Sequence, residues 1–139
     1  MKDIQTNYKK IIIYLLLVSA IFILDRLSKL YILNLAENNS SVDIYLNSFL
    51  NLYLVWNKGI AFGLLSFDQS YFYNFMTILI SIVTLMILIM IYRSNNFKVY
   101  FLLAIFSGSL GNLFDRIYYT AVPDFIDFHI NNFHWFIFN

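Results

Sequence analysis

The side chains with the clearest chemical potential are carboxylates beside long apolar segments. Asp25 directly follows the apolar run Ile11–Leu24, and Lys29 lies one helical turn further along the same face. At a rise of about 1.5 Å per residue, Asp25 falls in the outer third of a bilayer core about 30 Å thick. An ionisable residue at that depth indicates function, and an interfacial ion pair that only anchors the helix is the alternative.

A second polar stripe lies in the apolar run Val99–Phe114 and continues beyond it. Gly108, Gly111, Asn112 and Asp115 recur at three- and four-residue steps, so they share one face of a helix. Small residues at this spacing allow two membrane helices to approach closely. We therefore expect the amide and the carboxylate to face a neighbouring helix, either as part of a site or as packing and anchoring residues.

A pair of carboxylates follows in the segment Val122–His129. Pro123 disfavours a continuing helix, so Asp124 starts or follows a turn. A short helix beginning there would put Asp124 and Asp127 on one face. Burial and a neighbouring carboxylate both raise the pKa of an acid, and aspartic proteases use these conditions to share one proton between two carboxyls. The alternative role for Asp124 is an ordinary helix N-cap.

These candidate residues require a membrane to position them. Of the 139 residues, 60% are hydrophobic and 12% are charged, against about 45–50% and about 25% in typical soluble domains. The pattern predicts a single mainly α-helical membrane domain over 1–139, with spans at about 11–33, 72–92 and 99–116. The absence of cysteine excludes thiolate chemistry, and the presence of only two histidines argues against a zinc site built on paired histidines.

Basic residues set the expected orientation. Lys9 and Lys10 precede the first span, and Arg93 and Lys98 lie in the short link between the second and third spans. Because cytoplasmic loops carry an excess of Lys and Arg, we place the N-terminus in the cytoplasm. The segments of about 34–71 and 117–139 then lie outside.

The predicted outer segment contains two local features. Loose alternation between apolar and polar residues over Val42–Val55 predicts a small extracytoplasmic β-hairpin, with its turn at Asn47 and Ser48. The string Asn57-Lys58-Gly59 follows, and by itself it indicates only a turn.

Taken in order, these motifs resemble those of bacterial lipoprotein signal peptidases (signal peptidase II). The matching strings are Asp25-x-x-Ser28-Lys29, Asn57-x-Gly59-x-Ala61-Phe62, Gly108-x-x-Gly111-Asn112-x-x-Asp115-Arg116 and Val122-Pro123-Asp124-Phe125. The run His134–Asn139 is similar to the lead-in to the family's final motif, Phe-Asn-x-Ala-Asp. Each string is unspecific alone, but five in order, from about Ile11 to Asn139, are specific. Ser107 and Pro123 stand where the family usually has glycine and valine.

The resemblance implies an aspartic endopeptidase of the bacterial inner membrane. Such an enzyme cleaves prolipoproteins on the amino side of a lipid-modified cysteine, at the outer membrane face, and requires no metal or cofactor. Asp124 matches one of the two catalytic aspartates. Supporting or substrate-binding positions are matched by Asp25, Lys29, Asn57, Gly59, Asn112, Asp115, Arg116 and Asn139. The expected partners are lipid-modified prolipoproteins and membrane lipid, with no nucleic acid.

The motif that begins at Asn139 would place the second catalytic aspartate, and a fourth membrane helix, beyond the end of the chain. We therefore expect the chain as given to be C-terminally truncated and inactive. A catalytically inactive relative that still binds lipopeptide is one alternative. A small proton- or ion-relay protein is another, but its polar residues would have to line a path across the membrane, whereas these gather at one face.

Overall fold

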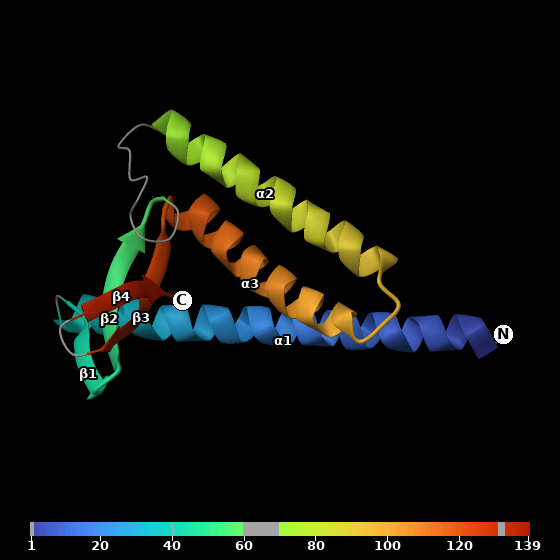
Figure 1. The fold of residues 1–139 in the computed structure, drawn as a ribbon, viewed down its shortest axis with the longest axis horizontal. Helices are drawn as coiled ribbons and strands as arrows, with labels where there is room; N and C mark the ends of the chain where they lie inside the picture. Colours follow the sequence, from blue (N-terminus) through green and yellow to red (C-terminus); the bar gives the residue numbers. More distant parts are fainter. Residues whose placement is uncertain (1, 40, 60–69, 131–132) are drawn as a thin grey trace.

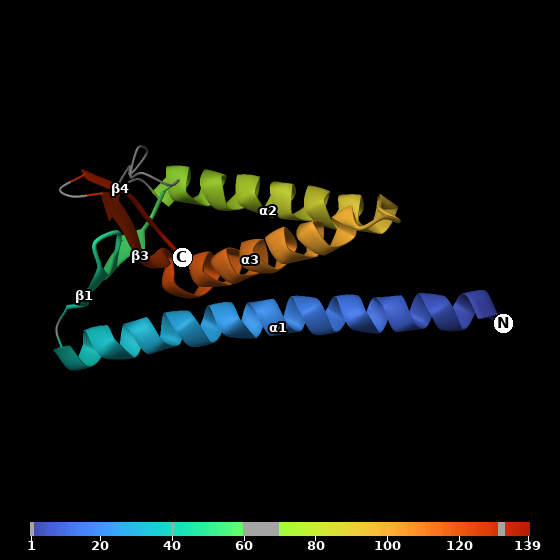
Figure 2. The ribbon, with the colours of Figure 1, turned by 60° about the horizontal axis from the view of Figure 1, so that its bottom comes forward.

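The computed structural model describes residues 2–39, 41–59, 70–130 and 133–139. Within them, three helices and four strands follow one another along the chain. They are α1 (Lys2–Asn39), β1 (Asp43–Asn47), β2 (Leu50–Asn57), α2 (Ser70–Arg93), α3 (Lys98–Tyr119), β3 (Val122–Ile130) and β4 (Phe133–Phe138). Helix α3 lies between α1 and α2, and the sheet lies at one end of the helices, opposite the N-terminus (Figures 1 and 2).

Two of the described helices are long and apolar enough to cross a membrane, by length and composition. They are Tyr8–Asn39 within α1 and Tyr71–Arg93 within α2. Both expose aliphatic side chains, among them Leu16, Leu24 and Leu85, a distribution that suits lipid and is unfavourable in water. The prediction of a mainly helical protein with apolar spans is confirmed in this coarse form. Helix α3 forms where the third span was predicted, but it is not among the helices that meet the same criterion.

Helix α3 approaches α1 through aromatic side chains and one glycine. Tyr14 packs edge-on against Tyr100, with the ring centroids 5.9 Å apart. Gly111 lies directly against Asp25, whereas none of the described residues comes within 4 Å of where a Cβ on Gly108 would lie. The close approach that the small residues allow is therefore seen at Gly111 and, among the described residues, not at Gly108.

The strands form one antiparallel sheet in the order β1-β2-β3-β4. Strands β1 and β2 make the predicted hairpin, in which Ile44 lies opposite Leu52. The turn lies at Ser48 and Phe49, one position later than predicted. The Oδ1 atom of Asn47 stabilises it by accepting a hydrogen bond from the backbone N–H of Phe49 (2.9 Å).

The chain after α3 forms a strand and not the short helix that would have put Asp124 and Asp127 on one face. Residues Val122–Ile130 make β3, which pairs with both β2 and β4. Pro123 lies at the start of this strand, before the part that pairs with β4, where its missing N–H is tolerated. The reversal from α3 into β3 occurs at Thr120, whose φ of 56° is left-handed.

The last turns of α1 pack against the sheet. The helix continues beyond Leu33 to Asn39. Ile32 forms a buried apolar core with Val42 and with Phe125 of β3. This contact fixes β3 against α1 one residue from Asp124.

Candidate active site

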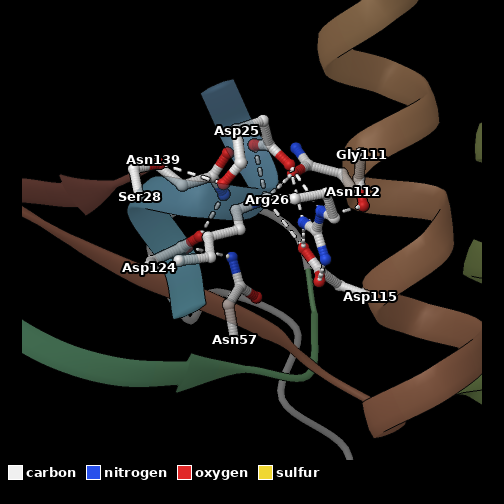
Figure 3. Close-up of polar contacts among 10 residues, drawn as sticks. Asp25, Arg26, Ser28, Asn57, Gly111, Asn112, Asp115, Asp124 and Asn139 are labelled. Atoms are coloured by element: carbon white, nitrogen blue, oxygen red, sulfur yellow. Dashed lines mark hydrogen bonds and ion pairs between the residues drawn. The ribbon is translucent and has the colours of Figure 1, made fainter. Parts of the chain in front are cut away.

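Charged side chains from α1 and α3 meet where these helices approach the sheet (Figure 3). Asp115 is fully buried and accepts hydrogen bonds from both guanidinium Nη atoms of Arg26 (Nη2 to Oδ2, 2.8 Å) and from Lys29 (Nζ to Oδ2, 2.7 Å). Lys29 also pairs with Asp25 (2.8 Å) and donates to Oδ1 of Asn112 (2.8 Å). Only 1% of Lys29 is exposed, so the predicted Asp25–Lys29 pair lies inside the protein and does not snorkel to the membrane surface.

We call Asp25, Arg26, Lys29 and Asp115 the charge cluster. Its two carboxylates match its two cations, and this balance matters because one unpaired buried charge costs several kcal/mol, about 3–5 when a partner is removed. Arg26 was not predicted as a site residue. Its partner Asp115 is 89 positions away, so no local spacing rule could pair them. The available signal was an arginine inside the first apolar span.

Gly111 allows α1 and α3 to approach closely enough for this cluster to form. A Cβ at Gly111 would lie 2.8 Å from Cγ of Asp25, well inside the about 3.5–4.0 Å at which carbon atoms pack favourably. The carbonyl oxygen of Gly111 also accepts a hydrogen bond from Nη2 of Arg26 (3.4 Å). The predicted role of this glycine in helix packing is thus visible in the contacts of Asp25.

Asp124 lies on β3 beside the charge cluster, and only 6% of it is exposed. Its Oδ2 accepts a hydrogen bond from Asn57 at the end of β2 (2.8 Å), and its Oδ1 accepts one from Asn139 (2.6 Å). Burial raises the pKa of Asp124 above its ordinary value, while the two amides and the charges of Lys29 and Arg116 oppose the rise. This carboxyl therefore holds a proton to a higher pH than an exposed aspartate does.

Asn57 and Gly59 form the predicted turn and connect it to α3. The Oδ1 atom of Asn57 accepts a hydrogen bond from the backbone N–H of Gly59 (2.9 Å). The Gly59 carbonyl accepts one from the buried guanidinium of Arg116, which also lies over the ring of Tyr73. Nε and Nη1 of Arg116 are buried and have no hydrogen-bond partner among the described residues. Arg116 therefore retains donors for a further oxygen atom.

Two cavities meet at Asp124. The first, of about 570 Å³, lies between α2 and α3 and is lined largely by apolar side chains such as Met76, Ile80 and Ile105. The second, of about 520 Å³, lies at the ends of β2 and β4. The residues that line both cavities are Asn57, Gly59, Asp124 and Ile137. An elongated ligand that occupied both would pass the Asp124 carboxyl.

The structure brings the predicted site residues into one region, in two adjoining sets. Asp25, Lys29, Asn112 and Asp115 belong to the first set, and Asn57, Gly59, Arg116, Asp124 and Asn139 belong to the second. Asp127 belongs to neither. In a strand, Asp124 and Asp127 are an odd number of positions apart and face opposite sides of the sheet. The shared face was expected only if a short helix began at Asp124, and the strand does not form it.

Proteins with similar sequences and structures are known. The family described as signal peptidase (SPase) II matches residues 17–139. The lipoprotein signal peptidase of Pelagibacter ubique (strain HTCC1062) is 53% identical over 135 residues, which cover 97% of this chain and 81% of that protein. That of Anaplasma phagocytophilum (strain HZ) is 35% identical over 131 residues, covering 94% and 83%. A bacterial membrane enzyme solved at 2.3 Å resolution has a similar fold, with a TM-score of 0.62 and 25% identity, over 89% of this chain and 76% of that one.

Proposed function

The chain belongs to the signal peptidase II family of lipoprotein signal peptidases, and we propose that Asp124 is one of its two catalytic carboxylates. The reaction is hydrolysis of the peptide bond on the amino side of the diacylglyceryl-modified cysteine in a prolipoprotein. The observation that carries this assignment is the environment of Asp124. It is buried, each of its oxygens is held by an amide, and it lies where two cavities meet.

Hydrolysis by two carboxyls requires each to hold a different proton state. One carboxylate accepts a proton from water as the water oxygen forms a bond to the scissile carbonyl carbon. The other, as an acid, donates a proton to the carbonyl oxygen. As the C–N bond breaks, the first carboxyl gives the amine the proton that it took from water, and a hydroxyl of the tetrahedral intermediate returns a proton to the second carboxylate. The raised pKa of Asp124 supports a part in this exchange, because the carboxyl can be present in either form closer to neutral pH.

The resemblance assigns the partner carboxylate to the motif that begins at Asn139. The hydrogen bond from Asn139 to Asp124 (2.6 Å) supports that assignment, because it holds the first residue of the motif against the Asp124 carboxyl. The partner's role remains a prediction from the resemblance.

The charge cluster acts as a positioning device in this proposal. Asp25 on α1 and Asp115 on α3 share the cations Arg26 and Lys29, which fastens the two helices together. Strand β3 follows α3 after a single reversal, so fixing α3 also fixes the strand that carries Asp124.

The two cavities supply room for the two parts of the substrate. The first cavity is largely apolar and lies between helices, which suits the acyl chains of the modified cysteine. The second cavity lies beside strands β2 and β4, where an extended peptide can run to the scissile bond. Arg116 lines the first cavity, and a shift of its buried guanidinium would bring an unpaired donor to a carbonyl oxygen of the substrate.

For the membrane arrangement, we propose three spans formed by α1, α2 and α3, with Asp124 at the outer face of the bacterial cytoplasmic membrane. Lys9 and Lys10 lie near the N-terminus of α1, and Arg93 and Lys98 lie at the connection between α2 and α3. In Figure 1 the N-terminus and this connection both lie at the end of the helices away from the sheet. Basic residues gathered at that end support a cytoplasmic placement for it.

The test is Asp124→Asn in the protein expressed from its native gene in bacterial membranes. A lipid-modified prolipoprotein is the substrate, and the loss of its signal peptide is followed on a gel. We expect the cleavage rate to fall by at least about 100-fold at an unchanged protein level, because acid–base groups contribute at least that much. Asp43→Asn, on the exposed strand β1, is the matched control and should cleave normally. Cleavage by Asp124→Asn within a few-fold of the control would remove Asp124 from the mechanism.

A further inference from the structure

A further group of side chains lies on β3 and β4 and takes no part in the proposed proton transfers, although one member, His134, also lines the second cavity. Asp127 and His129 come from β3 and His134 from β4, and one ligand atom from each lies within 4.8 Å of the others. Asp127 and His129 are buried, at 3% and 7% exposure, whereas His134 is exposed. The two imidazole rings stack, with their centroids 5.0 Å apart. The group is therefore compact and open to solvent on one side.

Hydrogen bonding inside the group leaves buried polar atoms unsatisfied. Nδ1 of His134 lies 2.8 Å from Oδ2 of Asp127, and Nδ1 of His129 lies 3.8 Å from the same oxygen. Oδ1 of Asp127 and Nδ1 of His129 are buried and have no hydrogen-bond partner within the part of the chain that the structure describes. Native structures rarely leave such atoms unpaired, because each carries the full desolvation penalty. An additional ligand would satisfy them.

We propose that Asp127, His129 and His134 bind a divalent transition-metal ion, Zn²⁺ foremost. Two imidazole nitrogens and one carboxylate oxygen form a ligand set that zinc accepts, with water as the fourth ligand on the exposed side of His134. Ligand atoms about 2.0–2.1 Å from a tetrahedral ion lie about 3.4 Å from one another. The observed separations from Oδ2 of Asp127, 2.8 and 3.8 Å, lie on either side of that value. All three ligand atoms lie within 4.8 Å of one another, so the site closes around an ion when the more distant atoms move inward.

The presence of only two histidines in the sequence argued against a zinc site built on paired histidines. The antiparallel pairing of β3 with β4 supplies such a pair, since His129 lies directly opposite His134 in the ladder. A bound ion would fasten the two strands near the Ile130–Phe133 end of their ladder. The other end of the same ladder carries Asn139, which donates to Asp124. The ion's role is thus to hold the sheet, and it takes no part in the hydrolysis.

The test is metal binding by the full-length protein in detergent, purified without a histidine tag. Co²⁺ is the titrant, because its visible absorption reports the ligand set, and Zn²⁺ is then added as a competitor. We expect one Co²⁺ per chain, displaced by Zn²⁺, and a Zn²⁺-dependent rise in the midpoint of thermal unfolding. His134→Gln should weaken binding by more than about 100-fold, since loss of an outer partner of a ligand already costs about 10–100-fold.

Matched variants separate metal binding from folding. His134 is exposed, so His134→Gln should fold, which is checked by an unchanged unfolding midpoint without metal. Asp127→Asn should also lose binding. Asp43→Asn changes an exposed acid on β1, at the far edge of the same sheet, and should bind like the unmodified protein. The proposal is overturned if the unmodified protein binds Co²⁺ no more tightly than folded His134→Gln. It is also overturned if Zn²⁺ stabilises both proteins equally.

Discussion

Substitution of Gly111 by alanine provides the sharpest test of how the charge cluster is held. A Cβ at this position would lie 2.8 Å from Cγ and 3.3 Å from Oδ1 of Asp25. Favourable carbon contacts need about 3.5–4.0 Å, so α1 and α3 would have to separate by roughly 1 Å or Asp25 would have to leave its place. Either change stretches the contacts of Asp25 with Arg26 and Lys29.

The expected size of the effect follows from three contributions. Overpacking costs about 1–3 kcal/mol, and complete loss of a partner in a buried ion pair costs about 3–5 kcal/mol. Alanine is the better helix former by about 1 kcal/mol, which acts in the opposite direction. Lys29 retains Asp115 and Asn112, so the ion-pair loss is partial. We expect a net destabilisation of about 2–4 kcal/mol, measured as the free energy of unfolding of the detergent-solubilised protein.

Gly108 is the matched control on the same helix. None of the described residues lies within 4 Å of where its Cβ would be. Gly108→Ala should therefore raise the free energy of unfolding by up to about 1 kcal/mol through helix propensity alone. If Gly111→Ala proved as stable as Gly108→Ala, the close approach of α1 and α3 at Asp25 would be wrong.

Two further predictions concern residues at the start of β3, Thr120 just before it and Asp124 within it. Thr120→Gly should raise the unfolding free energy by about 1–2 kcal/mol in thermal unfolding, because a left-handed backbone costs a non-glycine residue about that much. Unchanged stability would show that Thr120 is not strained. The pKa of Asp124 is raised above 3.8 on folding by burial, so the stability contributed by its protonated form is complete below 3.8 and is lost as the pH rises through the folded value. Asp124→Asn, which stays neutral, should thus unfold at a higher temperature than the unmodified protein at neutral pH. The difference should shrink as the pH falls toward 3.8, and a difference independent of pH would refute the burial argument.

The features that depend on local spacing could be predicted from the sequence. The apolar runs predicted the helices. The four-residue step from Asp25 to Lys29 predicted an ion pair, and the structure contains it. Alternation over the outer segment gave the hairpin of β1 and β2. The resemblance named both Asn57 and Asp124 as site residues, and the structure joins them by a hydrogen bond.

The features that depend on long-range pairing could not be predicted from the sequence. Strand β3 is buried along most of its length, so its sequence lacks the alternation that marks a strand with one wet face. Because the strand was not predicted, the opposite orientations of Asp124 and Asp127 could not be inferred. The pairing of Arg26 with Asp115 and of His129 with His134 likewise required the fold, since neither follows from a helical or strand repeat.

The balanced charge of the cluster bears directly on what Asp124 can do. Lys29 is close enough to lower the pKa of Asp124, yet burial is the larger influence and the pKa is raised. An uncompensated ammonium in a medium of low dielectric constant would hold a neighbouring carboxyl ionised. Lys29 is instead shared by Asp25 and Asp115, so much of its field is cancelled before it reaches Asp124. A mechanism with two carboxyls needs one of them to hold a proton. The same ion pairs that fasten α1 to α3 therefore also leave Asp124 able to hold one.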